Sequence, residues 1–268
     1  MTEVTAGCSL AFDVGPDGPA EIVLQIAAAR RPGVTVRDEL DVRLDGAPVP
    51  VETIETGDGG RLHVVRPGPG RLDVGYEVHA RLDPEPAPVT PLERIVYLRP
   101  SRYCPNDRLH GFAVAQFDPR SPTLAADVRA FVQERTQYTA GSSTATTDAA
   151  DTLLSGNGVC RDFAHLVVAL LRALDVPART AAVYAPGLSP MDFHAVAEVA
   201  VDGVWRVVDA TGLAPRPSLL RIATGPDAAT TAFATVQAGI AELSTMEVRA
   251  IVDGDLPHDD LSAAVTLP

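Results

Sequence analysis

Three residues of the types used in nucleophilic catalysis stand out in the sequence: Cys160, His194 and Asp209. Cys160 follows a glycine-containing run, 155–159, and opens the clearest helical pattern in the chain. In a first helical turn, unpaired backbone N–H groups and the helix dipole stabilise a thiolate, the reactive form of cysteine. The placement predicts an activated nucleophile. The alternative is that Cys160 is a small apolar core residue, because free cysteines are often buried.

A predicted hairpin brings His194 and Asp209 together. Asp202-Gly203 is a two-residue turn signal between two alternating strands, 194–201 and 204–211. In that register the two residues share one face as diagonal cross-strand neighbours. Such neighbours are roughly 7–8 Å apart at the backbone, which lets a carboxylate reach an imidazole.

The three residues together fit a nucleophile with an oriented base. His194 would take the thiol proton of Cys160 or hold the thiolate as an ion pair, and Asp209 would fix the orientation of the imidazole. Each residue also has a structural interpretation: a hydrogen-bonded histidine on a strand, or an aspartate that ends one. The three residues occur in the order Cys, His, Asp, and the hairpin register that brings the last two together can be worked out from the sequence. Together these facts favour the catalytic interpretation.

The second half of the chain carries the elements that must position these groups. Residues 160–174 have apolar residues at helical spacing, and Pro177 ends the pattern. A helical pattern also follows Ser121-Pro122, and a strand-like run precedes the hairpin. The remaining expectations are a short helix over 148–154, a helix over 227–236, a last strand over 244–252 and a loose end.

The pattern of the first half, residues 1–98, predicts a separate β-domain. Short β-branched runs alternate with turn signals such as Gly57-Asp58-Gly59-Gly60, which is typical of an antiparallel sandwich or partial barrel. A proline-rich link, 83–88, closes this part. We therefore predict a β-domain over 1–98 and a second domain over 99–268, with its own last strand and tail.

Composition narrows the classes of function. The 268 residues carry a formal net charge of −13, and every basic side chain is arginine. An acidic surface repels phosphate backbones, so nucleic acid is not expected as a partner. No apolar run approaches the roughly 20 residues that a membrane helix needs. Three cysteines with no close pair suit a reducing compartment, so we expect a cytoplasmic protein.

Several of these segments resemble motifs of the transglutaminase-like superfamily. The nucleophile motif is similar to Gly158-Val159-Cys160-Arg161-Asp162-Phe163-Ala164-His165-Leu166, and the helix exit to residues 171–179. The histidine and aspartate strands of the family are similar to residues 194–199 and 202–211. The junction Arg99-Pro100-Ser101-Arg102-Tyr103-Cys104 is similar to that of bacterial members with an N-terminal β-domain.

This resemblance implies an α+β fold with a papain-like core, in which a helix bearing the nucleophile packs on an antiparallel sheet. It implies thiol acyl transfer on a carboxamide or peptide carbonyl, through a thioester resolved by water or an amine, with a protein or peptide as substrate. Peptidase, deamidase and crosslinking activities stay open. The family usually carries an aromatic residue two positions after the histidine, where this chain has Val196.

Other residues and functions remain as alternatives. Tyr103 is a weak candidate for an oxyanion or substrate contact, and an interface tyrosine is the simpler interpretation. Asp162 and His165 are spaced to stabilise the nucleophile helix. No spacing of metal ligands is present, so neither a metal nor a cofactor is expected. The competing functions are a catalytically silent scaffold and an arylamine N-acetyltransferase, whose Arg-Gly-Gly sequence before the cysteine is missing here.

Overall fold

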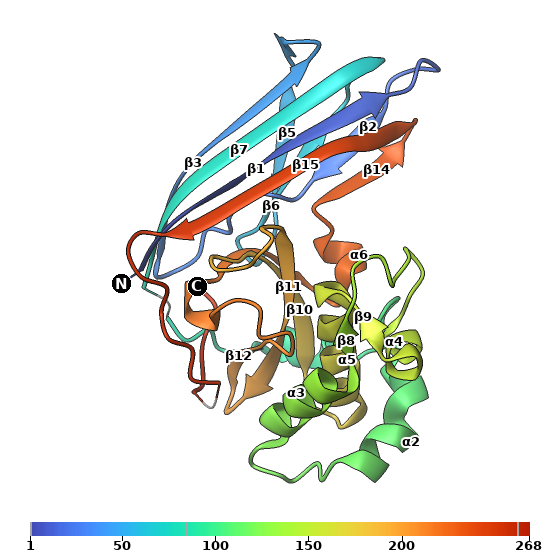
Figure 1. Ribbon diagram of the computed structural model, residues 1–268, viewed down its shortest axis with the longest axis vertical. Helices are drawn as coiled ribbons and strands as arrows, with labels where there is room; N and C mark the ends of the chain where they lie inside the picture. The colour runs from blue at the N-terminus through green and yellow to red at the C-terminus, as the bar shows by residue number, and fades with distance from the viewer. Residues whose placement is uncertain (1, 84, 262) are drawn as a thin grey trace.

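The computed structural model describes residues 2–83, 85–261 and 263–268 (Figure 1). Pro84, within the predicted proline-rich link, lies outside them. Two antiparallel sheets form a sandwich over a second, mixed unit. The five-stranded sheet has the order β15 (Ala241–Val252), β1 (Thr2–Val14), β7 (Gly70–Leu82), β3 (Val34–Leu44) and β4 (Ala47–Pro48). The four-stranded sheet has the order β14 (Ala234–Ala238), β2 (Glu21–Leu24), β6 (Arg61–Val65) and β5 (Val51–Glu55).

The sandwich follows from alternation along its long strands. In β7 every second side chain is buried, from Leu72 to Leu82, and the residues between them face outward. β1 pairs with β7 in unbroken register, so its buried side chains meet those of β7 on the same face. The inner faces of the two sheets share one apolar core, which also includes Tyr184 and Ile222 from the second unit.

The β unit is not confined to the first part of the chain. β14 pairs with β2, and β15 pairs with β1 along eleven positions. The predicted division at residue 98 assigned both strands to the second domain. The correction has a physical reason: after α6 the chain leaves the second unit and covers the edge of β1, a long-range pairing that no local pattern encodes.

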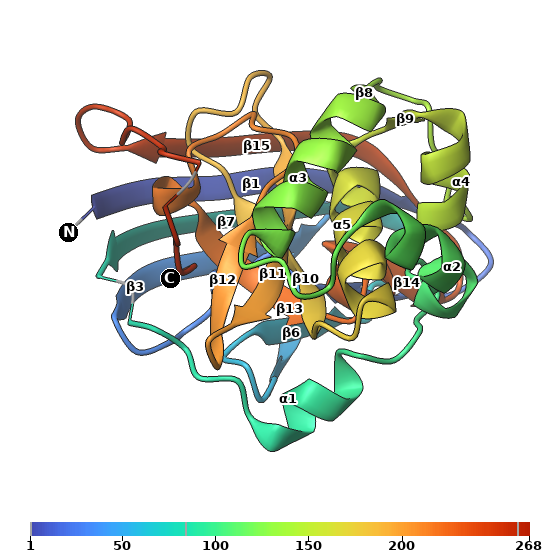
Figure 2. The ribbon, with the colours of Figure 1, turned by 90° about the horizontal axis from the view of Figure 1, so that it is seen from below.

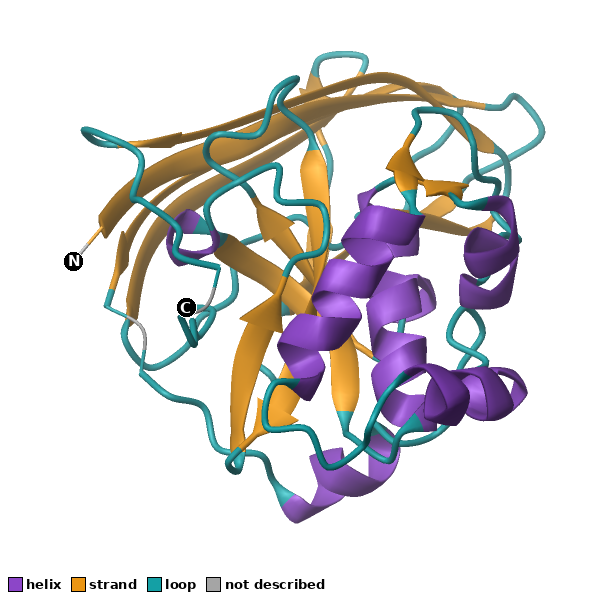
Figure 3. Cartoon of the chain, turned by 60° about the horizontal axis from the view of Figure 1, so that its bottom comes forward, coloured by secondary structure: helices purple, strands orange, loops and turns teal. Residues whose placement is uncertain are grey.

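The second unit is a four-stranded antiparallel sheet with most of its helices packed on one face (Figures 2 and 3). The sheet has the order β12 (Val204–Val208), β11 (Phe193–Val201), β10 (Ala178–Tyr184) and β13 (Leu220–Gly225). The helices are α1 (Pro91–Val96), α2 (Asn106–Gln116), α3 (Leu124–Arg135), α4 (Ala149–Ser155), α5 (Cys160–Ala173) and α6 (Ala228–Thr231), with a short 3₁₀ turn at Arg216–Ser218. Strands β8 (Gln137–Tyr138) and β9 (Asn157–Gly158) form a short parallel pair. The predicted α+β class is confirmed.

α5 is the central helix of this unit. Its side chains from Asp162 to Ala173 are buried, because α2, α3 and α4 surround it and the sheet closes the remaining side. Ala197 and Val199 of β11 pack in the same cluster as the helix. Val196 packs in a separate cluster with the C-terminal Leu267, which is 1% exposed. The chain end, expected to be loose, is therefore buried.

Local signals predicted the main elements of this unit and missed others. The helices over α3, α4 and α5 and the hairpin strands are observed close to the expected bounds. The helix expected over 227–236 is only the short α6, after which the chain enters β14. α1, α2, β1 and β13 were not predicted. None of the helices in the described part of the chain is long and apolar enough to cross a membrane.

A buried ion network joins α1 to the catalytic sheet. The Glu198 carboxylate accepts hydrogen bonds from Arg179 at 2.8 Å and from Arg221 at 2.6 and 2.7 Å. Arg179 also bonds Glu93 of α1 and lies 4.1 Å from the Trp205 ring centroid. Burial raises the pKa of Glu198, but the two guanidinium groups outweigh it and hold the value at about 2.

Replacing Glu198 by glutamine is expected to lower the free energy of unfolding by about 3–5 kcal/mol, because two buried guanidinium charges lose their counter-charge. Urea denaturation measures this change. Glu247→Gln, on the exposed part of β15, serves as the matched control and should change stability by less than about 0.5 kcal/mol. Equal stability of the two variants would contradict the role of the network.

Candidate active site

Cys160 is the first residue of α5. The helix is preceded by Gly156 at φ +68°, which ends α4, and by the β8–β9 pair. The Asp162 carboxylate accepts the Val159 N–H at 2.8 Å and so caps the helix start. Cys160 is half-buried, whereas Cys8 and Cys104 are buried. The predicted turn therefore places one partly accessible thiol at a helix start, with its sulfur 4.0 Å from the Phe193 carbonyl oxygen.

The structure brings His194 and Asp209 together as the hairpin register predicted. Val201 pairs with Val204 across the turn, and the pairing continues to Ala197 and Val208. His194 Nε2 lies 3.0 Å from Asp209 Oδ2, and both side chains are buried. A rigid hairpin thus holds the imidazole against a carboxylate.

Asp209 is itself held in place. Its other oxygen, Oδ1, accepts the backbone N–H and the hydroxyl of Thr211, each at 2.7 Å. Burial raises the pKa of Asp209, but His194 and the Thr211 donors outweigh it and keep the pKa below its usual value. The carboxylate is therefore charged when it faces the imidazole.

The second ring nitrogen of His194 is left for the thiol. Nδ1 is buried and has no hydrogen-bond partner within ordinary limits. Burial lowers the pKa of His194, but Asp209 and then the nearby Cys160 sulfur raise it to about 10. An imidazolium beside the sulfur is the arrangement that keeps a thiolate ready to react.

Tyr138 is a member of the site that the sequence analysis missed. Its hydroxyl lies against the thiol and the backbone N–H of Cys160, and its ring packs at 6.0 Å from that of Phe163. Burial, followed by the negative charge of Cys160, raises the pKa of Tyr138 to about 12, so the hydroxyl stays protonated and can donate a hydrogen bond. Only the β8–β9 pairing places this residue, 22 positions before Cys160 in the sequence, at the helix start.

Asp192 adds a negative charge at the mouth of the site. The carboxylate accepts the Phe193 N–H at 2.7 Å and is exposed on its other side. Partial burial raises the pKa of Asp192 above its usual value, and the Phe193 N–H and the charge on His194 offset only part of this effect. Its charge also acts on Tyr138. The residue therefore lies within electrostatic range of both groups that contact Cys160.

Tyr103 does not join this group. Its hydroxyl donates to the Ala145 carbonyl, and its ring stacks on His165 with centroids 5.2 Å apart. Among the described residues, no contact links Tyr103 with Cys160 or His194. The oxyanion role considered for Tyr103 has no geometric support here, and its packing matches that of an interface tyrosine.

His165 lies behind the site and does not pair with Asp162. It is fully buried, and its Nε2 accepts the Ala228 N–H at 3.1 Å. Burial lowers the pKa of His165 to about 4, so it is neutral. In the described part of the chain, no group of three or more His, Cys, Asp or Glu side chains could hold a metal ion.

Known proteins resemble this chain in sequence and in structure. Residues 114–210 match the sequence model of the transglutaminase-like superfamily. A candidate cysteine protease from Cytophaga hutchinsonii is 28% identical, with a TM-score of 0.89 over 98% of this chain and 96% of that one. The periplasmic domain of TgpA from Pseudomonas aeruginosa bound to ethylmercury is 20% identical, with a TM-score of 0.43 over 77% of this chain and 90% of that one. No curated protein matches the chain.

The matched segment contains Cys160, His194 and Asp209, and the likeness to the Cytophaga structure extends over both units of the chain. The resemblance seen in the motifs is thereby confirmed. Over residues 114–210 this chain is similar to the transglutaminase-like superfamily.

Proposed function

We propose that the protein is a cysteine enzyme that transfers or hydrolyses acyl groups of carboxamide or peptide substrates, with Cys160 as nucleophile. One observation carries this proposal: Asp209 engages Nε2 of His194, while Nδ1 stays unpaired beside the Cys160 sulfur. A carboxylate on one ring nitrogen and a thiol near the other is the arrangement of a general base with its orienting group. The similarity to a candidate cysteine protease supports the same class of reaction.

The reaction divides into two acyl transfers. The Cys160 thiolate attacks the substrate carbonyl and forms a tetrahedral adduct. Collapse of the adduct breaks the C–N bond, and the amine or ammonia leaves with the proton of the His194 imidazolium. The thioester is then attacked by water or a second amine, whose proton His194 accepts, and the thiolate is released. Asp209 holds the ring in place and stabilises its charged form throughout.

Two donors are available to the oxyanion of the adduct. The backbone N–H of Cys160 points away from the start of α5, and the Tyr138 hydroxyl lies against that N–H. A pair of such donors stabilises the charge that develops on the carbonyl oxygen. In this proposal the carbonyl oxygen displaces the Tyr138 oxygen from the N–H and receives a hydrogen bond from the hydroxyl.

The decisive experiment compares the wild-type protein and Cys160→Ala on a peptide library with a primary amine present. Mass spectrometry scores cleavage, ammonia release and amine incorporation separately. The proposal predicts at least one product that forms with the wild type and not with the variant. If no product depends on the sulfur, the protein is a silent scaffold and the proposal is wrong.

The three cysteines should differ in their reactivity. Burial raises the pKa of Cys8 to about 11 and that of Cys104 to about 12, so both are protonated thiols at neutral pH. Iodoacetamide at neutral pH is therefore expected to label Cys160 at least about tenfold faster than either of them. Peptide mapping measures the three rates, and His194→Ala should slow only the labelling of Cys160. Equal rates in the folded protein would contradict an activated thiol.

A further inference from the structure

One edge of the large sheet has no partner strand. β15 is 12 residues long and pairs with β1 on one side; within the described residues it pairs with no strand on the other side. Natural sheets usually protect such an edge with proline or lysine, because its backbone groups otherwise accept another strand. β15 contains neither residue, although it carries three charged side chains and a bulge, which also limit pairing. Within the described residues its outer backbone groups have no partner strand, so an extended chain can pair with them.

The side chains of β15 have an exposed apolar stretch on the inner side of the sheet. Met246 pairs with Leu10 and Leu243 with Phe12, and both partners are buried in the sandwich core. A bulge between these two pairs brings Leu243 and Met246, three positions apart, to the same face. They are nevertheless 41% and 39% exposed, so the core does not cover this end of the strand.

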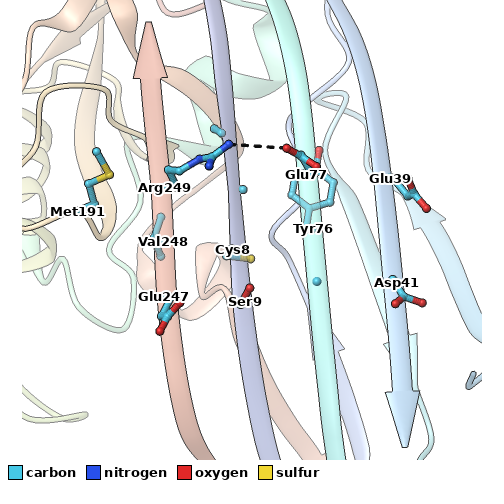
Figure 4. Close-up of a pocket in the computed structure, with 13 residues that line it drawn as sticks. Cys8, Ser9, Glu39, Asp41, Tyr76, Glu77, Met191, Glu247, Val248 and Arg249 are labelled. Carbon is cyan, nitrogen blue, oxygen red and sulfur yellow. Dashed lines mark ion pairs between the residues drawn. The ribbon is translucent and has the colours of Figure 1, made fainter. Parts of the chain in front are cut away.

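Met191 links this edge to the candidate active site, because Phe193, two residues later, has its carbonyl oxygen 4.0 Å from the Cys160 sulfur. β15 is the edge strand of the large sheet on the side of the loop that carries Met191 (Figure 4). Met191, 44% exposed, lies beside the edge and borders a cavity of about 660 Å³ together with Glu247 and Arg249 (Figure 4). Three residues later along the chain is His194. The loop that delivers the catalytic imidazole thus runs from the β15 edge to the thiol.

We propose that the free edge of β15 is a docking strand for the substrate, which is an unfolded or extended polypeptide segment rather than a folded surface or a small amide. The segment adds to the sheet edge by backbone hydrogen bonds, and its side chains alternate between the inner face, where they contact Leu243 and Met246, and the outer face, where they contact Met191. It continues past Asp192 to place a carboxamide or peptide carbonyl at Cys160. The inference rests on the proposed function for its chemistry and on the sheet edge for its substrate class.

The charges along this path favour a basic segment. Glu242 and Glu247 on β15 are exposed, and Asp192 stands at the mouth of the site. Arg249, the one basic residue of β15, faces the outer side of the sheet and pairs with Glu77 at 3.8 Å. An extended segment carrying lysine or arginine close to the reacting group therefore meets complementary charge.

The test measures binding separately from turnover. All variants are made in the Cys160→Ala background, and the probe is a fluorescein-labelled 15-residue peptide of alternating valine, glutamine and arginine. Met246→Lys places a charge on the apolar end of the edge. Ile251→Lys is the matched control, because Ile251 is equally exposed on the same strand, but it pairs with Thr5 and points to the outer face. Both sites are exposed, and thermal unfolding verifies that the variants fold.

Fluorescence anisotropy should show that Met246→Lys weakens peptide binding about tenfold and that Ile251→Lys leaves it within about twofold. A version of the peptide with alternate backbone nitrogens methylated should also bind at least about tenfold more weakly, because it cannot pair with the edge. Equal binding to both variants, or unchanged binding of the methylated peptide, would overturn the docking strand. The binding results do not depend on catalysis, so the two proposals are tested separately. Docking without any sulfur-dependent product would contradict the proposed function alone, and a sulfur-dependent product without docking would contradict the docking strand alone.

Discussion

Replacing Cys160 by alanine is expected to lower kcat/KM for any sulfur-dependent product by at least about 10⁴-fold. Removal of the nucleophile of a catalytic triad costs this much or more, because the remaining groups only bind and polarise the substrate. The fold should be unaffected: the side chain is half-buried, and its loss leaves the α5 cap formed by Asp162 intact. Initial rates by mass spectrometry, with far-ultraviolet circular dichroism on the same samples, measure both effects.

Two matched controls separate chemistry from stability. Cys104→Ala removes a fully buried sulfur from the core around α5 and should lower stability by about 1 kcal/mol with little change in rate. Cys160→Ser keeps the size of the side chain, but a hydroxyl is a much weaker nucleophile than a thiolate beside an imidazolium. Retention of more than about a tenth of the wild-type rate in Cys160→Ala would exclude the proposed mechanism.

Asp209→Asn is expected to lower kcat by about 10³–10⁴-fold while leaving KM nearly unchanged. The asparagine is close in size to the aspartate, so the buried site stays filled, but it cannot stabilise the imidazolium and permits the wrong ring tautomer. Steady-state kinetics on the best product of the library separate kcat from KM. A loss smaller than about tenfold would show that Asp209 only supports the strand end.

Asp209→Asn should also change how the rate of Cys160 alkylation depends on pH. In the wild type the pKa of His194 is about 10, above the ordinary 6.5, since Asp209 and Cys160 outweigh the effect of burial. The charged imidazole therefore contributes to folding stability fully below pH 6.5, and this contribution is lost as the pH rises toward 10. Without Asp209, burial lowers the pKa of His194, and the rate of Cys160 alkylation should fall at neutral pH. Alkylation rates from pH 5 to 10 measure the shift.

Thr211→Val is the milder companion of this variant. It removes the hydroxyl donor to Asp209 Oδ1 and keeps the backbone N–H bond. We expect a loss of no more than about tenfold in kcat, because the carboxylate retains its charge and its contact with His194. A loss as large as that of Asp209→Asn would mean that orientation of the carboxylate, not its charge, limits the reaction.

Local patterns were enough to predict the parts of the site that lie on strongly periodic elements. The register of the hairpin followed from one turn signal, so the His194–Asp209 contact could be worked out before any coordinates. The start of α5 was marked by glycines on one side and helical periodicity on the other. These features depend on neighbours a few residues apart along the chain.

Tyr138 is a member of the site that such local patterns did not predict. It stands in a two-residue strand whose partner, β9, is also two residues long, and neither strand has a periodic pattern. Tyr103, in contrast, occupied a recognisable junction motif, but its contacts within the described residues are with groups such as His165 and Ala145 and not with the thiol. Proximity to a motif in sequence therefore did not predict proximity to the sulfur.

The amino-acid sequence by itself determined the helix that presents Cys160 and the pairing of His194 with Asp209, because turn chemistry and periodicity act over short separations, and its motifs gave the α+β class through their resemblance to a known family. Only the tertiary structure decided that β14 and β15 complete the N-terminal sheets, that Tyr138 reaches the thiol and that Met191 lies beside the edge of β15. Each of these depends on pairing between segments far apart in the chain, where many partners have equally suitable local patterns and the packing of the whole molecule selects one.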